Sequence, residues 1–346
     1  MRNIAEVVIN EKPLREILEN HKHWLNKDVR EWRTLKANLY GADLHEVDLY
    51  GVDLYGVDLR YANLRYANLC GADIRKADLY GADLRYANLC SADLYGADIR
   101  KANLCSANLC EANLCSADLR EANLCGADIR KANLCGADLR YADLRYANLY
   151  GADIRKGKLG SADLCEANLY GADIRKADLY GANLYGADIR KANLYGVDLR
   201  EADLYGADLR EADFYGAKLH NTPLYGADLY GAKNTPYIPM ICPEEGAFIG
   251  YKKASKKIVQ LSIPGDAKRS SATTRKCRCN KANVIAIYNL DGTLAKETEV
   301  TSDRDVNFIY RIGEEVRVDD FDENRWNECS TGIHFFMQRR EAVEYN

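Results

Sequence analysis

The most regular feature of the chain is a spacing of five residues between its large apolar positions. Leucine, isoleucine or, once, phenylalanine occupies every fifth position from 39 to 229, without an insertion or deletion. A small apolar residue, nearly always alanine, stands two positions earlier, and an aspartate or asparagine usually stands between the two. Five steps turn an α-helix by about 500° and reverse the face of a strand, so neither element keeps these residues together. The pattern predicts a backbone that turns by a fixed amount in each pentad and holds alanine and leucine inside.

A repeat of this kind is typical of a solenoid, in which stacked coils share one apolar core. The motif A-[D/N]-L-x-x resembles that of the pentapeptide repeat proteins. The resemblance implies an all-β solenoid, a right-handed quadrilateral parallel β-helix, in which four pentads form each coil. We expect this body to span 37–232. The aspartate or asparagine of each pentad is expected to support a turn, because such side chains bond nearby backbone and tolerate unusual φ angles.

Both ends of the chain depart from the repeat. Apolar side chains follow Pro13 on one helical face, so 1–36 is predicted to be a helical cap that contains a helix over 13–25. Prolines punctuate 233–245, which is interpreted as a linker or cap. Alternating segments such as KIVQLSI and NVIAIY, with a closing QRREAVEY, predict a small β-rich α+β domain over 246–346.

This last domain resembles a domain of unknown function that follows pentapeptide repeats in phage and bacterial proteins. The resemblance lies in the stretches AKRSSATTRKCRCNKA and ECSTGIHFF. It implies no settled activity.

Charge and hydropathy exclude some classes of protein. The formal net charge of −4 does not fit a basic nucleic-acid binder over the whole chain. No apolar run has the length of a membrane span, and the first residues lack the apolar segment of a signal peptide. We therefore expect a cytoplasmic protein with free thiols, no membrane contact and no cofactor.

In coils of four pentads, side chains 20 positions apart form outward ladders. The candidate binding residues of the repeat are an acidic stripe, its arginine neighbours and a tyrosine column: Asp58, Asp78, Asp98, Asp118 and Asp138; Arg100, Arg120 and Arg140; Tyr185, Tyr205 and Tyr225. Two interpretations of the acidic stripe stay open. The arginines balance the carboxylates on an ordinary surface, or the carboxylates imitate a DNA backbone, as the resemblance to gyrase-binding pentapeptide repeat proteins implies.

The clustered cysteines of the repeat are a further candidate for a metal site. Cys105, Cys110 and Cys115 lie five residues apart, so they are expected on different sides of a coil and cannot converge on one metal. Their expected neighbours are cysteines in the next coil, such as Cys125 and Cys135.

The C-terminal domain carries two further candidate sites. Its basic segment, 252–281, contains Lys268, Arg269, Arg275, Lys276 and Arg278, which are candidates for binding nucleic acid unless they face the acidic segment 291–328 within the fold. Cys277, Cys279, Cys329 and His334 are weak candidates for a metal site, because their spacing is not that of a standard zinc finger. Cys329 and His334 are also considered as a nucleophile pair.

Together these features favour a non-enzymatic scaffold that presents tyrosine, arginine and aspartate ladders to a protein partner. Tyrosine and arginine are the residues enriched at binding hot spots. No nucleophile elbow, phosphate loop or paired-carboxylate signature is present. Two alternatives remain: mimicry of DNA toward gyrase, topoisomerase or another DNA-binding enzyme, and a C-terminal domain that binds nucleic acid or carries an unrecognised activity.

Overall fold

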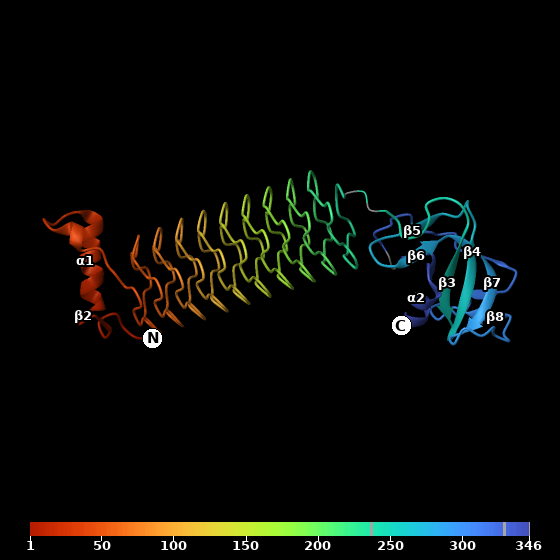
Figure 1. Cartoon of the computed structure of the whole chain (residues 1–346), viewed down its shortest axis with the longest axis horizontal. Helices are drawn as coiled ribbons and strands as arrows, with labels where there is room; N and C mark the ends of the chain where they lie inside the picture. Colours follow the sequence, from red (N-terminus) through yellow and green to blue (C-terminus); the bar gives the residue numbers. More distant parts are fainter. Residues whose placement is uncertain (236, 238, 328–329, 346) are drawn as a thin grey trace. The chain divides into compact units, whose positions relative to one another are not determined.

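The computed structural model describes residues 1–235, 237, 239–327 and 330–345. The chain forms two compact units, Met1–Pro236 and Tyr237–Asn346 (Figure 1). In the described part of the chain, no helix has the length and apolar character needed to cross a membrane.

The repeat region is a stack of coils joined by parallel β-bridges. Each bridge links equivalent residues of successive coils, such as Asn38 with Asp58 and Asp118 with Asp138 (Figure 1). The Leu119 N–H donates to the Asp138 carbonyl at 2.7 Å, and the Asp138 N–H donates to the Ala117 carbonyl at 2.9 Å. One coil therefore holds four pentads, and the sheet-like hydrogen bonds run between coils.

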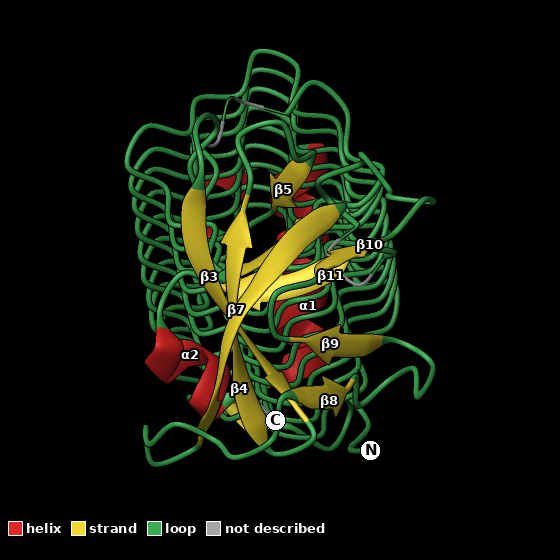
Figure 2. Cartoon of the chain, turned by 90° about the vertical axis from the view of Figure 1, so that its right-hand side faces the viewer, coloured by secondary structure: helices red, strands yellow, loops and turns green. Residues whose placement is uncertain are grey.

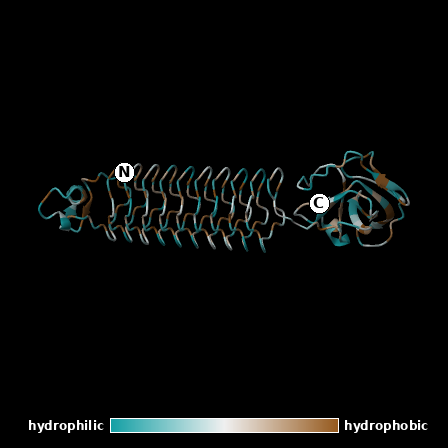
Figure 3. Cartoon of the chain, turned by 90° about the horizontal axis from the view of Figure 1, so that it is seen from above, coloured by the Kyte–Doolittle hydropathy of each residue, from teal (hydrophilic) through white to brown (hydrophobic). Residues whose placement is uncertain are grey.

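Alanine and leucine fill the interior of every coil. Ala122 and Leu124, for example, are each only 1% exposed. Figure 3 shows apolar and polar stretches alternating around the coils. The inward positions predicted from the spacing of five are confirmed, and the core is continuous because each coil repeats the same positions.

A tight turn closes each pentad. In the pentad of Leu119, the Ala122 N–H donates to the Leu119 carbonyl at 3.0 Å, and Glu121 has a φ of +59°. A positive φ at the third residue is typical of a type II turn. Asp118 Oδ1 accepts from the Arg120 N–H at 3.2 Å, which confirms the predicted side-chain support. The unusual φ was expected on the aspartate and falls instead three residues later, because the aspartate backbone forms the bridge between coils.

The N-terminal segment consists of short elements before the first coil. They are β1 (Val8–Ile9), β2 (Lys12–Pro13), α1 (Leu14–Asn26) and the 3-10 helix η1 (Trp32–Thr34). Pro13 is the N-cap of α1 and not part of its first turn. Leu14, Leu18 and His21 are buried, and the Trp24 ring lies beside Gly56 of the first coils. The helix predicted over 13–25 is thus present, displaced by one residue at each end.

His21 makes the N-terminal segment sensitive to acid. Its side chain is fully buried and stacks on Trp24 with ring centroids 5.1 Å apart. The Ala37 N–H donates to His21 Nδ1 at 3.3 Å, so this nitrogen must remain unprotonated. Burial lowers the pKa of His21, with a smaller contribution from Lys36 and opposition from Asp53 and the backbone of Tyr55. The folded state therefore favours the neutral imidazole.

We expect the N-terminal segment to lose stability as the pH falls. A histidine in the unfolded chain protonates near a pKa of about 6.5, whereas folded His21 resists protonation to lower pH. Its stabilising contribution is complete above that value and is lost as the pH falls through the folded pKa. Hydrogen exchange of α1 measured across this range tests the expectation. The loss should disappear in His21→Gln and persist in the control His23→Gln, and a pH profile unchanged by His21→Gln would contradict it.

The second unit is built around an antiparallel sheet. Its elements are β3 (Phe248–Ala254), β4 (Lys257–Ile263), β5 (Arg269–Ser271), β6 (Lys276–Cys279), β7 (Lys281–Asn289), β8 (Glu299–Thr301), β9 (Ile309–Arg311), β10 (Glu315–Arg317), β11 (Ile333–Phe336) and α2 (Arg339–Glu344). The seven-stranded sheet has the order β10-β7-β4-β3-β11-β6-β5, and β8 pairs with β9 separately. Figure 2 shows β3, β4 and β7 crossing the unit, with α2 beside them.

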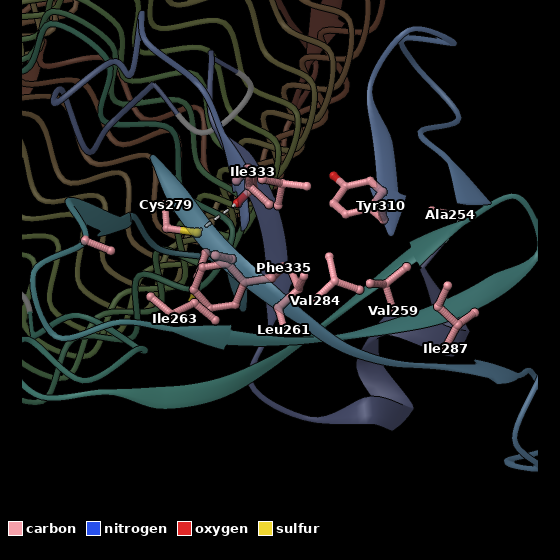
Figure 4. Packing of buried hydrophobic residues seen from close by; sticks show 14 of the residues in the cluster. Ala254, Val259, Leu261, Ile263, Cys279, Val284, Ile287, Tyr310, Ile333 and Phe335 are labelled. Atoms are coloured by element: carbon pink, nitrogen blue, oxygen red, sulfur yellow. Dashed lines mark hydrogen bonds between the residues drawn. The ribbon is translucent and has the colours of Figure 1, made fainter. Parts of the chain in front are cut away.

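The two faces of this sheet are covered unequally. The larger core contains Leu261, Val284 and Phe335, and Tyr310 of β9 covers it (Figure 4). On the opposite face, Ile258 and Phe336 pack with Ala342 of α2. The predicted β-rich domain with a closing helix is therefore present.

Candidate functional site

The acidic stripe of the repeat region is paired with arginine. Arg120 donates from Nε to Asp118 Oδ1 at 2.9 Å and from Nη2 to Asp118 Oδ2 at 2.7 Å. It also lies 3.9 Å from Asp138 of the next coil. The same two-pronged contact joins three further pairs: Arg60 with Asp58, Arg100 with Asp98, and Arg140 with Asp138. Residues two apart flank the inward leucine and so project on the same side of the coil.

These contacts balance the charge of the stripe. Hydrogen bonding to Arg60 holds the pKa of Asp58 below its usual value, so the pair stays ionised at neutral pH. Asp78 is followed by Tyr80, yet its Oδ2 still lies 3.5 Å from Arg60 Nε. Exposed ion pairs contribute about 0–1 kcal/mol each, so their main effect is to neutralise the surface. The geometry favours the charge-balanced interpretation of the stripe over a row of bare carboxylates.

The tyrosine column consists of Tyr185, Tyr205 and Tyr225. Their rings are stacked, with centroid separations of 5.4 Å and 5.2 Å. The three side chains are 44%, 41% and 43% exposed. A second stack, Tyr195 with Tyr215 at 5.4 Å, lies two pentads away along the chain. The column is an ordered aromatic surface, since equivalent positions of successive coils hold each ring in register.

The cysteines of the repeat region are half-buried thiols. All the cysteines in the described part of the chain are free. Burial raises the pKa of Cys110 and of Cys125, with a smaller contribution from Asp128 and Asp143 respectively. A thiol is a weak nucleophile and a weak metal ligand until it ionises. The described residues also contain no cluster of three or more potential metal ligands.

The arginines of the basic segment bind backbone carbonyl groups within their own unit. Arg269 donates to the carbonyls of Gly246, Pro264 and Gly265, each at 2.8 Å. Arg278 is 2% exposed and donates to the Thr331 carbonyl at 2.8 Å. Both side chains therefore hold loops in place.

The other three candidate cations, Lys268, Arg275 and Lys276, are also engaged. Lys268 pairs with Glu323, and Arg275 pairs with Glu341 of α2. Lys276 lies over the Tyr345 ring, 5.9 Å from its centroid. The pairing of Lys268 agrees with the alternative in which the basic and acidic segments face each other, and these contacts argue against an open nucleic-acid surface.

The candidate metal ligands do not converge. Cys277 and Cys279 point into the larger core, where both are fully buried. His334 pairs across the sheet with Arg278, and the alternation of a strand places it on the face opposite both cysteines. Cys329 lies outside the described residues. The metal site built on these four residues, and the pair of Cys329 with His334, thus gain no support from the described geometry.

The repeat and the C-terminal unit each match a known family. A model of pentapeptide repeats matches residues 37–75, 72–109, 92–130, 117–155, 158–194 and 192–231. The chain therefore belongs to the pentapeptide repeat family. Residues 238–342 match a family of unknown function, DUF5758.

Solved structures of other pentapeptide repeat proteins are similar to the repeat region. HetL, involved in heterocyst differentiation regulation in the cyanobacterium Nostoc sp. strain PCC 7120, is 36% identical over 58% of this chain and 91% of its own, with a TM-score of 0.47. Rfr23 from the cyanobacterium Cyanothece 51142 is 31% identical over 34% of this chain and 90% of its own, with a TM-score of 0.22. QnrB1, a plasmid-mediated fluoroquinolone resistance protein, is 19% identical over 57% and 88%, with a TM-score of 0.31. No curated protein matches the chain in sequence.

Proposed function

We propose that the repeat region is a non-enzymatic scaffold that binds a protein partner through the tyrosine column. The observation that carries this proposal is the stacking of the exposed rings of Tyr185, Tyr205 and Tyr225, with interplanar angles of 3° and 29°. Tyrosine supplies a large contact area at low cost in side-chain entropy, and it is enriched at hot spots. Stacking between coils orders the rings before a partner arrives, which further reduces the entropy lost on binding.

The tyrosine column is not needed to fill the core. Leucine and alanine fill the interior of the coils, and Leu184 and Leu204 beside the column are each 1% exposed or less. The rings project outward from a framework that is already complete. An aromatic surface that the fold does not require is therefore available for recognition.

Removing the tyrosine column is expected to abolish capture of the partner. In a crosslinking pull-down with the full chain, the triple variant Tyr185→Ala, Tyr205→Ala, Tyr225→Ala should lose about tenfold or more of the specific signal. A matched control is Tyr150→Ala with Tyr170→Ala, which removes another stacked pair, with centroids 5.6 Å apart. Circular dichroism should show that both variants keep the repeat structure. Equal capture by the triple variant and the wild type would refute the proposal.

Two alternatives remain predictions with weaker support. DNA mimicry needs an exposed carboxylate row, and the forked arginine contacts of the acidic stripe counter its charge. Nucleic-acid binding by the C-terminal unit needs free cations at the basic segment, where Arg269 and Arg278 instead donate to carbonyl groups. The tyrosine column is the better supported surface.

A further inference from the structure

A lysine occupies a core position of the C-terminal sheet. Lys252 of β3 pairs with Val259 of β4, and both it and Ala254 alternate on the face that carries the larger core. Val259 and Ala254 are fully buried. The side chain of Lys252 is half-buried, and an apolar side chain would suit this position, since withdrawing an ammonium group from water is costly without a compensating partner. The charge of Lys252 therefore does not serve the packing of this sheet, which suggests a role in binding.

Lys252 forms no ion pair with the described residues, although Asp303 lies in the same surroundings. Its Nζ lies 5.8 Å from the Tyr310 ring centroid. No carboxylate oxygen of the described residues lies within 4.0 Å of this nitrogen. Burial lowers the pKa of Lys252, Asp303 opposes this shift, and the nearby cations Arg304 and Lys276 make smaller contributions that lower the pKa further. An anion bound beside it would supply the missing charge.

A cavity opens beside Lys252 where two strands separate. β3 and β11 share a single register pair, Tyr251 with Phe336, although each continues beyond it. The cavity has a volume of 390 Å³ and is lined by Lys252, Arg304, Phe308 and Tyr310, among others. This volume falls within the range of about 300–1,000 Å³ found for small-molecule sites. Tyr310 and Ile333 of this lining lie near each other in Figure 4.

A second hollow adjoins this cavity and carries an excess of cations over carboxylates, whereas the first is lined by two of each. It measures 260 Å³ and shares Lys252, Ser302, Arg304 and His334 with the first, while adding Lys276. Lysine and arginine thus approach the same space from β3, from β6 and from the loop between β8 and β9. Such convergence of cations from separate elements is suited to an anionic group.

The acidic residues of the lining are partly engaged elsewhere. Asp303 Oδ1 accepts from the Ser255 N–H at 2.7 Å, and Asp305 Oδ1 accepts from the Asn307 N–H at 2.9 Å. Arg304 lies between them in the sequence. No carboxylate oxygen of the described residues lies within 4.0 Å of its guanidinium nitrogens. Lys252 and Arg304 thus form no ion pair with the described residues, while Asp305 and Asp320 of the same lining keep their charge.

We propose that this cavity binds a nucleoside monophosphate. Lys252 and Arg304 would hold the phosphate, whose two negative charges match two cations. Phe308, whose side chain is half-buried in the lining, would contact the base, since aromatic side chains stack on the faces of bases. Ser302 and Asp320 of the lining would bond the ribose hydroxyls. This site is independent of partner binding by the repeat region.

Calorimetric titration of the full chain with AMP, GMP, CMP and UMP tests the proposal. Inorganic phosphate and adenosine are titrated alongside, to separate the contributions of the phosphate and of the base. We expect at least one monophosphate to bind about tenfold or more tightly than either fragment. Lys252→Met and Arg304→Gln should each weaken that binding by about tenfold to a hundredfold, as loss of a charged hydrogen bond does. Lys256→Met, which alters an exposed lysine of the same hairpin, should leave it unchanged.

The variants also separate a binding role from a structural one. Lys252→Met removes a half-buried charge from an apolar face, so the free protein should melt at a higher temperature while its affinity falls. Arg304 is exposed, and its replacement tests binding without changing the core. The proposal is overturned if no monophosphate binds more tightly than inorganic phosphate, or if Arg304→Gln and a folded Lys252→Met both bind as the wild type does.

Discussion

Truncating Leu124 to alanine is expected to destabilise the repeat region by about 2–5 kcal/mol. Leu124 is 1% exposed and lies between Leu104 and Leu144 of the adjoining coils. Parallel bridges hold the backbone on both sides, through Asn103 with Asn123 and Asn123 with Asp143. Because these bridges keep the spacing of the coils, the surrounding atoms cannot collapse to fill the space that the leucine leaves. The loss therefore belongs to the upper part of the range for large-to-small substitutions.

Urea unfolding followed by circular dichroism measures this loss. Each coil of a solenoid is stabilised by its contacts with the two neighbouring coils. A destabilised coil in the middle should therefore also broaden or split the unfolding transition. The adjacent Cys125→Ala is the matched control, since this half-buried side chain faces outward and its loss should cost about 0.5 kcal/mol or less. Equal effects of the two substitutions would show that the core is not organised around the leucine positions.

The repeat region could be predicted from the sequence because its pattern admits few geometries. A spacing of five without insertions must place the alanine and the leucine of every pentad in the same environment. Ala122 and Leu124 are an example, and the structure buries both. The turn chemistry was predicted less completely. The sequence predicts the bond from the aspartate side chain but not the positive φ at Glu121, because the residue at that position varies among glycine, serine, glutamate, lysine, tyrosine and asparagine.

Charge was the least reliable guide to the candidate sites. A count of lysines and arginines in 252–281 cannot show whether each side chain faces water or a carbonyl group. Arg269 and Arg278 face carbonyl groups, because the loops around them need donors. Nor does such a count distinguish Lys252, whose place in its strand faces the core, from the exposed lysines of the segment. Strand alternation in FIGYKKA places this lysine between Gly250 and Ala254 on the buried face, and this signal was present in the sequence.

Adding one methyl group at Gly250 should destabilise the C-terminal unit by about 1–3 kcal/mol. An alanine Cβ would lie 2.6 Å from Phe335 Cδ2 and 3.0 Å from Ile263 Cδ1. Phe335 is fully buried in the larger core and has no solvent toward which to move. Alanine in place of glycine normally favours an extended strand through chain entropy, so a net loss would come from the steric conflict. Hydrogen exchange of the β4 peptides during urea unfolding reports on this unit separately from the repeat.

A double-mutant cycle identifies Phe335 as the source of the conflict. Phe335→Leu alone should be destabilising, yet combined with Gly250→Ala it should recover about 0.5–3 kcal/mol relative to the sum of the single effects. Gly265→Ala is the control, because its nearest contact would be an ordinary 3.5 Å. Strict additivity in the cycle would contradict the predicted contact.

Gly250 and Lys252 share one face of β3, so the methyl group should also disturb the cavity beside the lysine. Monophosphate binding by the Gly250→Ala variant should then weaken in parallel with its stability and recover with the second substitution.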